Sequence, residues 1–349
     1  AAYTTIDDPE AHFQVQLYTG NGSADHAITL GGDTDMQQDL VWIKNRDAAD
    51  SHCFFDAVRG ATELLDPAET TAETTDADTL DSFTSDGFQV DADVKVNTSS
   101  EKYVAWCWKA NGTGSSNTDG SINTAATSAN TTSGISINTF SGTGANATIG
   151  HGLGIAPTVL LCKHIASGSD NWNWNNFSVS ALGNTGRIYF NDTAGNSAAA
   201  AAWNSTAPTS TLVSLGSNGE NNGSSMVLYA FAPIQGFSKF GNFFGNGAAD
   251  GTFIPLGFKP SWFMLKRIDG SAGWYIYDNK RVGYNVDNNH LLASEVDGES
   301  AADHLDFLSN GVKLRVAGSG VNNSGFNYLY MAFAEQPFVN SEGVPCNAR

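Results

Sequence analysis

Short apolar runs, four to six residues long, recur along the whole chain between clusters of Gly, Asn, Asp and Ser. The runs are rich in β-branched and aromatic residues, and helical periodicity is nearly absent. This pattern predicts short β-strands joined by turns. The runs at 41–43 and 263–265 show no alternation of apolar and polar positions. We therefore expect central strands there, covered on both faces.

Three landmarks recur in the same order along the chain: an aromatic residue before a Gly-rich turn, an apolar run that ends in lysine, and an apolar run that contains alanine. The turns are Tyr18-Thr-Gly-Asn-Gly22, Phe140-Ser-Gly-Thr-Gly144 and Phe244-Gly-Asn-Gly247; the lysine runs are Leu40-Val-Trp-Ile-Lys44, Val159-Leu-Leu-Cys-Lys163 and Trp262-Phe-Met-Leu-Lys266; the last runs are Tyr103-Val-Ala-Trp106, Leu228-Tyr-Ala-Phe231 and Tyr330-Met-Ala-Phe333. From the second turn glycine, the lysine follows after 22, 19 and 19 residues and the alanine after 83, 86 and 85. Landmarks in constant order and near-constant spacing indicate an internal repeat.

The repeat predicts an all-β fold of three tandem β-sandwich, jelly-roll-like modules of about 100 residues each. The predicted divisions are an N-terminal arm (1–12), an acidic first module (13–112), a Gly/Ser/Thr/Asn linker (113–134), a second module (135–236), a third module (237–340) and a C-terminal tail (341–349). The predicted repeat core comprises Trp42, Lys44, Trp106, Leu161, Lys163, Phe231, Phe263, Lys266 and Phe333. We expect Trp42, Leu161 and Phe263 to lie in equivalent central strands.

The segment between the first two modules is almost wholly Gly, Ser, Thr, Asn and Ala, with Ile122 as its one strongly apolar residue. Such a composition is typical of a flexible or draped linker. A short connection, Ala232-Pro-Ile-Gln-Gly236, joins the second and third modules. We therefore expect these two to form a rigid pair and the first module to be set apart.

The charge of the chain is concentrated in the first module. The 349 residues carry 17 basic and 36 acidic side chains, a net charge of −19. Residues 1–112 account for −15, and residues 113–236 and 237–349 for −2 each, with eleven acids between Glu63 and Glu101. So few basic residues argue against nucleic-acid binding and against an anionic membrane. We expect 63–101 to face solvent or cations, while the two near-neutral modules make oligomer and particle contacts.

Motifs for catalysis and cofactor binding are missing from the sequence. It has no G-x-S-x-G elbow, phosphate-binding loop, H-E-x-x-H pair or complete G-x-G-x-x-G. Acids at 76–81 and 91–93 offer oxygen ligands for calcium, but neither stretch matches the twelve-residue calcium loop. The seven scattered histidines are expected at the surface or satisfied in the core, and the four cysteines as small core residues. We predict no enzyme activity, cofactor or metal.

Trp172 and Trp174 are the candidate glycan contacts. They lie two residues apart among several asparagines, so both rings share one face of a strand. Exposed rings at such positions could stack on a sugar. The alternative is that both fill the module core, as Trp274-Tyr-Ile-Tyr277 suggests at the corresponding place in the third module.

Several motifs resemble the repeated module of tail-fibre or minor structural proteins in the virions of marine tailed phages. They are Ala2-Tyr-Thr-Thr-Ile-Asp-Asp-Pro9, Leu17-Tyr-Thr-Gly-Asn-Gly22, Asp39-Leu-Val-Trp-Ile-Lys-Asn-Arg46, Phe55-Asp-Ala-Val-Arg-Gly60, Ser82-Phe-Thr-Ser-Asp-Gly-Phe88, Tyr103-Val-Ala-Trp-Cys-Trp-Lys109, Phe140-Ser-Gly-Thr-Gly144 and Gly150-His-Gly-Leu-Gly-Ile-Ala-Pro157. The resemblance covers most of 1–112, continues to 157 and weakens in the third module. The family supplies no catalytic residues to carry over.

The resemblance implies a protein of the virion surface, assembled in the host cytoplasm as a fibre or capsid decoration. Its implied partners are other copies of itself, most often in a homotrimer, other virion proteins and a host surface glycan. Neither a signal peptide nor a membrane-spanning segment is expected from the sequence. The alternative is a glycan-binding or glycan-degrading protein, a lectin or polysaccharide depolymerase, that shares the module.

Overall fold

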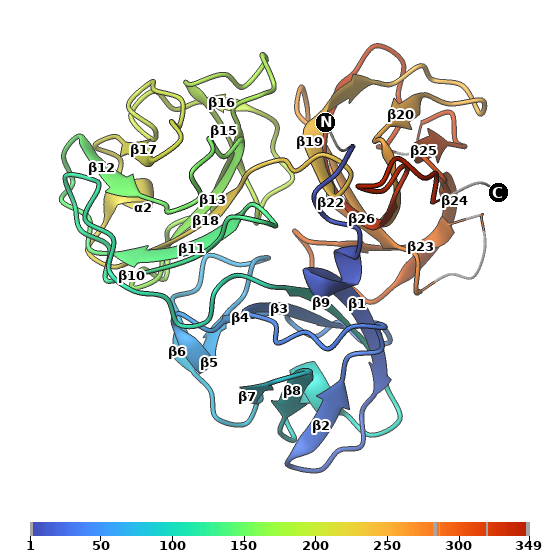
Figure 1. Cartoon of the computed structure of the whole chain (residues 1–349), viewed down its shortest axis with the longest axis horizontal. Coiled ribbons are helices and arrows are strands. Elements are labelled where there is room, and N and C mark those ends of the chain that lie inside the picture. Colours follow the sequence, from blue (N-terminus) through green and yellow to red (C-terminus); the bar gives the residue numbers. More distant parts are fainter. Residues whose placement is uncertain (1–2, 282–284, 286, 319, 347–349) are drawn as a thin grey trace.

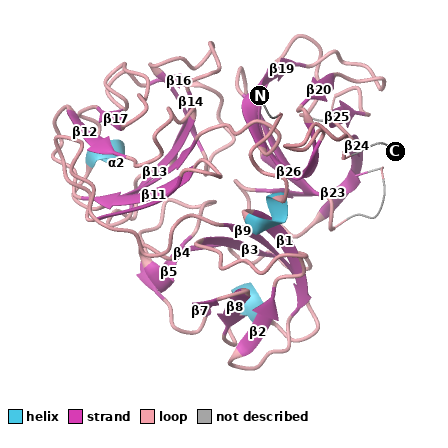
Figure 2. Ribbon diagram, in the orientation of Figure 1, coloured by secondary structure: helices cyan, strands magenta, loops and turns pink. Residues whose placement is uncertain are grey.

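The computed structural model describes residues 3–281, 285, 287–318 and 320–346, and its regular structure is almost wholly antiparallel β-sheet. Figure 1 shows three lobes that surround a common centre, in chain order. Figure 2 shows how little helix there is: two single turns, α1 (Val94–Asn97) and α2 (Gly219–Asn222), besides the 3-10 turn η1 (Pro9–Ala11). The all-β prediction is confirmed.

The first lobe consists of a six-stranded sheet, β1-β9-β3-β4-β5-β6, and a three-stranded sheet, β2-β8-β7. Its strands are β1 (Phe13–Thr19), β2 (His26–Thr29), β3 (Leu40–Asn45), β4 (Cys53–Asp56), β5 (Gly60–Leu65), β6 (Thr74–Thr75), β7 (Leu80–Thr84), β8 (Gly87–Val90) and β9 (Lys102–Trp108).

The second lobe consists of a seven-stranded sheet, β10-β11-β18-β13-β14-β15-β16, and the pair β12-β17. Its strands are β10 (Ala126–Asn130), β11 (Ile135–Phe140), β12 (Ala147–Gly150), β13 (Val159–His164), β14 (Asn173–Asn176), β15 (Gly186–Tyr189), β16 (Ser197–Ala198), β17 (Leu212–Leu215) and β18 (Met226–Phe231).

The third lobe is one continuous sheet, β19-β26-β21-β22-β23-β24-β25-β20. Its strands are β19 (Ser238–Phe244), β20 (Phe253–Pro255), β21 (Phe258–Arg267), β22 (Trp274–Asp278), β23 (Asp287–Leu292), β24 (Ser300–Leu308), β25 (Gly311–Leu314) and β26 (Asn327–Pro337).

The lysine runs form the strands β3, β13 and β21, and each of these lies between the last strand of its lobe and the strand that follows it in the chain. Trp42, Leu161 and Phe263 thus occupy corresponding strands. Their register differs, however: Trp42 and Leu161 are two residues before the lysine, whereas Phe263 is three before Lys266. Because side chains alternate between faces, Met264 is the third-lobe counterpart of Trp42, and Phe263 points to the other face.

Both faces of these central strands are buried. In β3, Leu40 and Trp42 join a core that all three lobes share, while Val41 and Ile43 join a separate core beneath the small sheet of the first lobe. A third cluster fills the corresponding place in the second lobe. The nine predicted repeat-core residues are all buried, with at most 5% of any side chain exposed. The three large sheets therefore turn one face toward a common aromatic centre and the other toward their own lobe.

The shared centre overturns the expectation that the first module is set apart. Trp106 and Trp108 of β9 stand against Trp262 of β21, with ring centroids 6.5 and 5.9 Å apart. Phe54 of β4 meets Tyr229 of β18 at 5.1 Å. The first lobe contacts both other lobes through large buried rings. The prediction rested on the Gly-rich connection after the first module, but the rings that pack the lobes together lie far from that connection in the sequence.

The predicted linker 113–134 also differs from expectation, because it contains strand β10. β10 pairs antiparallel with β11 from Ala126↔Thr139 to Asn130↔Ile135. Ser115 bridges to Thr127, and Ser128 Oγ accepts a hydrogen bond from Asn111 N at 2.8 Å. An edge strand is held by its backbone ladder, so small polar side chains suffice.

The two ends of the described chain meet on the third lobe. Tyr3 donates its hydroxyl hydrogen to Gly257 O at 2.8 Å, and Ile6 is buried in the shared core. Ser341 N donates to Asp7 Oδ1 at 2.7 Å. The predicted arm therefore reaches from the first lobe to the third, where the start of the predicted tail contacts it.

Candidate functional site

The three landmark lysines are buried at the junctions between lobes. Lys163 Nζ donates to Thr70 O of the first lobe at 2.8 Å and to Asp170 O of its own lobe at 2.5 Å. Lys266 Nζ donates to Thr193 O of the second lobe at 2.7 Å and to Ala272 O at 2.6 Å. Burial lowers the pKa of each lysine to about 8. Ammonium groups that bind only carbonyl oxygens act as loop anchors.

Lys44 has a similar anchoring role within the first lobe. Its Nζ donates to Asn45 O at 2.7 Å and to Ala48 O at 3.0 Å. The third lobe approaches the same loop, since Glu299 N donates to Arg46 O at 2.8 Å.

One backbone hydrogen bond recurs at all three junctions and closes the lobes into a ring. It joins an N–H of one lobe to the carbonyl two residues after the lysine of the next. The three bonds are Glu73 N to Ile165 O at 2.8 Å, Asn196 N to Ile268 O at 2.7 Å and Glu299 N to Arg46 O at 2.8 Å. The first lobe thus bonds to the second, the second to the third, and the third back to the first.

A buried carboxylate bridges the first and second lobes. Asp56 Oδ2 accepts the hydroxyl hydrogen of Tyr229 at 2.6 Å and pairs with Arg59 Nε at 2.6 Å. The side chains of Asp56 and Arg59 are 0% and 2% exposed. Burial raises the pKa of Tyr229 well above its usual value, so its hydroxyl keeps the proton that it donates. Both partners of the carboxylate are therefore in place, as a buried charge requires.

A second buried carboxylate bridges the third and first lobes in the same way. Asp278 Oδ2 accepts from Trp106 Nε1 at 3.0 Å and pairs with Arg281 Nε at 2.6 Å. Glu299 extends this bridge, because it pairs with Arg281 at 3.1 Å and with Arg46 of the first lobe at 3.0 Å.

Among the residues that the structure describes, none forms such a bridge between the second and third lobes. Asn176 pairs with Val159 in the ladder between β13 and β14. The same register position is occupied by Asp56 in the first lobe and by Asp278 in the third. Val179 replaces the arginine three residues on, and Met331 lies in the register position of Trp106 and Tyr229. Asn176 Nδ2 is buried without a hydrogen-bond partner. Carboxylate, arginine and donor are all replaced together.

His52 lies at the junction of the first and third lobes. Its Nδ1 accepts from Trp42 Nε1 at 2.9 Å, and its Nε2 faces Leu292 O at 3.1 Å and Glu295 O at 3.0 Å. Burial and the nearby Lys44 charge lower the pKa of His52 to about 3. A neutral ring with a proton on Nε2 satisfies all three contacts.

The structure contradicts the proposed glycan contacts. Trp172 and Trp174 are 0% and 1% exposed and belong to the shared core. Trp172 Nε1 donates to Asp66 O of the first lobe at 3.1 Å, and Trp174 meets Trp274 of the third lobe at 5.3 Å. Asn173 and Asn175 point to the opposite face of β14, whereas Asn176 shares the face of Trp174. The alternative of core packing is the correct one, and the two rings join three lobes rather than one module.

Sequence reasoning missed three buried asparagines that hold the Gly-rich turns. Gly22, Gly144 and Gly247 have φ angles of 69°, 67° and 66° and donate their N–H to the carbonyls of Asn97, Asn222 and Asn322. The side-chain oxygens of these asparagines also accept from the turn backbone. In the sequence, each of these asparagines lies eight to ten residues before the alanine of the third landmark. This signal is hard to notice because the chain contains many other asparagines.

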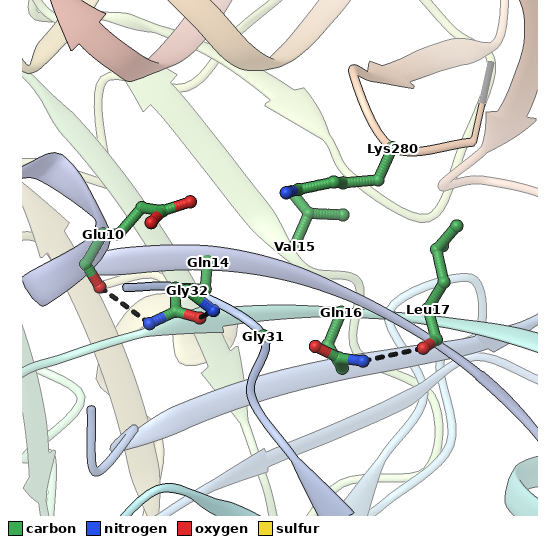
Figure 3. A pocket seen from close by; sticks show the side chains of 8 residues that line it. All are labelled: Glu10, Gln14, Val15, Gln16, Leu17, Gly31, Gly32 and Lys280. Carbon is green, nitrogen blue, oxygen red and sulfur yellow. Dashed lines mark hydrogen bonds between the residues drawn. The ribbon is translucent and has the colours of Figure 1, made fainter. Parts of the chain in front are cut away.

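A polar pocket of about 250 Å³ lies between β1 and the loop after β22 (Figure 3). Gln14 is held there by Glu10 O and Thr34 O and accepts from Gly32 N at 2.9 Å. Gln16 donates to Leu17 O at 2.7 Å. These amides are committed to the protein's own backbone, so the pocket does not present a converging set of unused donors.

Two aspartates of the acidic stretch 63–101 form ion pairs with a lysine of the same stretch. Lys95 Nζ contacts Asp76 at 3.3 Å and Asp93 at 2.8 Å, and Asp93 also caps α1. Among the described residues, no group of three or more His, Cys, Asp or Glu could hold a metal ion.

Cys53, Cys107 and Cys162 are buried as expected, whereas Cys346 is exposed. No helix in the described ranges is long and apolar enough to cross a membrane.

A family model described as a domain of unknown function (DUF7483) matches residues 8–337. A search of curated proteins found no match. The matched range spans all three lobes, which agrees with a ring that closes only when the third lobe returns to the first.

Proposed function

The chain belongs to the DUF7483 family, and we propose that it is a structural protein of the virion surface of a tailed phage, a fibre or capsid decoration that adheres to the host surface. Such a role needs no catalysis. Association with further copies of the chain, with other virion proteins and with a host surface glycan is part of the proposal.

The closed ring of lobes is the observation that carries this proposal. Three backbone bonds, two buried carboxylate bridges and one aromatic core join the lobes into a single body. In each bridge a side chain of one lobe donates a hydrogen bond to a buried carboxylate of another. A hydrogen bond to a charged group contributes about 1.5–3 kcal/mol, so each bridge resists separation of its lobes. Rigidity suits a protein that displays a surface. The motifs shared with phage virion proteins add the sequence support.

We further propose that the lobes are three copies of one β-sandwich module of about 100 residues. Five strands have the same order in each large sheet: β1-β9-β3-β4-β5, β11-β18-β13-β14-β15 and β19-β26-β21-β22-β23. By ladder register, Cys107, Ala230 and Ala332 correspond, and they follow the second turn glycine by 85, 86 and 85 residues. This agreement is closer than that of the alanine landmark in the sequence.

The proposal is tested on virus particles purified from the source that encodes the chain. Mass spectrometry is expected to find the chain in the particles, at a copy number that separates a fibre from a decoration. Cryo-electron microscopy is expected to show three-lobed density at repeated positions on the surface. Absence of the chain from purified particles would overturn the proposal.

The alternative is a lectin or depolymerase, and the two candidate glycan contacts for it, Trp172 and Trp174, are buried. Glycan arrays with the purified chain complete the test: strong glycan binding by a chain that is absent from purified particles would favour the lectin.

A further inference from the structure

A serine, a histidine and an aspartate are connected on the surface of the second lobe. His164, the last residue of β13, places its Nδ1 2.7 Å from Asp170 Oδ2 and its Nε2 3.3 Å from Ser224 Oγ. The two contacts use the two ring nitrogens, so the imidazole lies between a carboxylate and a hydroxyl. This is the order of groups that activates a serine as a nucleophile.

The local structure fixes this arrangement from both sides. Lys163, next to the histidine, anchors the loop that carries Asp170 by donating to its backbone oxygen at 2.5 Å. Gly223 lies against the imidazole, where a Cβ would come within 2.6 Å of the ring. Glycine lets the backbone pass this close, and bring Ser224 to Nε2, without displacing the imidazole. Ser224 itself is exposed, and the side chains of His164 and Asp170 are 17% and 27% exposed, so a solute can reach the hydroxyl.

The other two lobes have different chemistry at the places of His164 and Ser224. By register, Asn45 and Arg267 correspond to His164, and Glu101 and Phe326 correspond to Ser224. Asn45 donates to Asp50 and to Glu101, each at 2.6 Å.

The third lobe carries a cation at this place. Arg267 pairs with Asp269 at 3.0 Å and lies 3.6 Å above the ring of Phe326. In every lobe, therefore, the residue after the landmark lysine contacts the residue at the place of Ser224, and we call this contact the tether. An amide or guanidinium cannot take a proton from a neighbour, whereas an imidazole can.

We propose that Ser224, His164 and Asp170 form a hydrolytic site that cleaves small acyl esters. Ser224 Oγ attacks the ester carbonyl carbon while its proton passes to His164 Nε2. The C–O bond to the alcohol then breaks, and the alcohol leaves with that proton. Water attacks the acyl-serine, gives one proton to Nε2 and releases the acid, and Ser224 regains its proton. Ester and water become acid and alcohol. Asp170 is a positioning residue that holds the ring and stabilises the imidazolium.

The surroundings specify the substrate class. Ser224 lies on an open surface between Gly223 and Ser225, with Ser141 donating to its carbonyl oxygen at 2.7 Å. These two neighbours offer no apolar side chain to a long acyl chain, whereas an acetyl group needs none. The substrate is therefore a short acyl ester, such as an O-acetyl group carried on an accessible polymer. This inference goes beyond the structural role and does not depend on it.

The full chain is tested with p-nitrophenyl acetate and with a fluorophosphonate that labels activated serines. We expect hydrolysis with a burst of acyl-serine and a label on the peptide that contains Ser224. Ser224→Ala should lower the rate by about 100-fold, the typical contribution of an activated group, and abolish the label. The adjacent Ser225→Ala is the matched control and should change neither.

His164→Asn separates chemistry from structure, because the first lobe shows that asparagine keeps the tether at this place. The variant should keep the melting temperature and lose the hydrolysis. Asp170→Asn should lower kcat and leave KM and the melting temperature unchanged, a split that a merely structural residue would not cause. A label on another residue, or hydrolysis unchanged by Ser224→Ala or His164→Asn, would overturn the proposal.

Discussion

Two of the three junctions between lobes contain a buried carboxylate, and the third does not. Asp56 and Asp278 each accept a hydrogen bond from the neighbouring lobe and pair with an arginine three residues on. At the corresponding place between the second and third lobes stand Asn176, Val179 and Met331. A buried carboxylate is stable only while its cation and its donor are both present. The comparison teaches that such a bridge is gained or lost as a set.

The largest effect is expected from removing one carboxylate. Asp56→Ala leaves the buried Arg59 with Glu73 as its remaining acid partner and leaves the Tyr229 hydroxyl without its acceptor. We expect the free energy of unfolding to fall by about 3–5 kcal/mol. Asn176→Ala, the matched change at the third junction, should cost about 1 kcal/mol. Urea unfolding of both variants measures the difference; equal losses would show that the carboxylate bridge is not special.

Truncation in the central strands tests the packing on their two faces, the shared face at Trp42 and Leu161 and the opposite face at Phe263. Trp42→Ala, Leu161→Ala and Phe263→Ala should each lower the free energy of unfolding by about 3 kcal/mol or more, because each side chain is at most 5% exposed. Thermal unfolding checks the values. A loss below about 1 kcal/mol for Leu161→Ala would show that the second lobe is packed less tightly than the first.

Adding a lone carboxylate to the third junction should harm it. Asn176→Asp puts a charge at a buried place without an arginine, and we expect a loss of about 2 kcal/mol at pH 7. Acid should reduce this loss relative to the parent chain, because a protonated carboxyl is neutral. Adding Val179→Arg should restore part of the stability. An Asn176→Asp variant as stable as the parent at pH 7 would contradict the account given above.

Lowering the pH should reduce the free energy of unfolding through His52, which lies at the junction between the third and first lobes. Near neutral pH this reduction is small. His52 has a folded pKa of about 3, below the unfolded value of 6.5, so the unfolded state binds the proton more strongly. Its contribution is complete above pH 6.5 and falls by about 1.4 kcal/mol per pH unit below that. Denaturant midpoints between pH 7 and 4 measure the slope. His52→Gln should flatten it, and an unchanged slope would assign acid lability to other groups.

The strand pattern and the lysine landmarks could be predicted from the sequence, but the exact register could not. The alanine landmark aligned Trp106 with Phe231, whereas the ladders align Trp106 with Tyr229, two residues earlier. A slip of two residues keeps every side chain on its face, so the hydrophobic pattern does not detect it. The lysine stayed in register because its ammonium group must reach specific carbonyl oxygens.

The relations between lobes were beyond the sequence for a different reason. Trp172 and Trp174 are surrounded by asparagines in the chain, yet their own face of β14 meets the shared core. Likewise His164, Asp170 and Ser224 are separated by up to 60 residues and match no local motif. Contacts of this range depend on which sheets face each other, and one sequence does not fix that arrangement.

The return of the third lobe to the first makes the peptide connection between lobes mechanically redundant. A protease that cuts within 113–125 would break the covalent thread but none of the bonds Glu73–Ile165, Asn196–Ile268 and Glu299–Arg46. The two fragments would stay assembled and would separate only when denatured. In such a molecule, durability comes from its circular geometry, and an outer surface exposed to degrading enzymes can be nicked without falling apart.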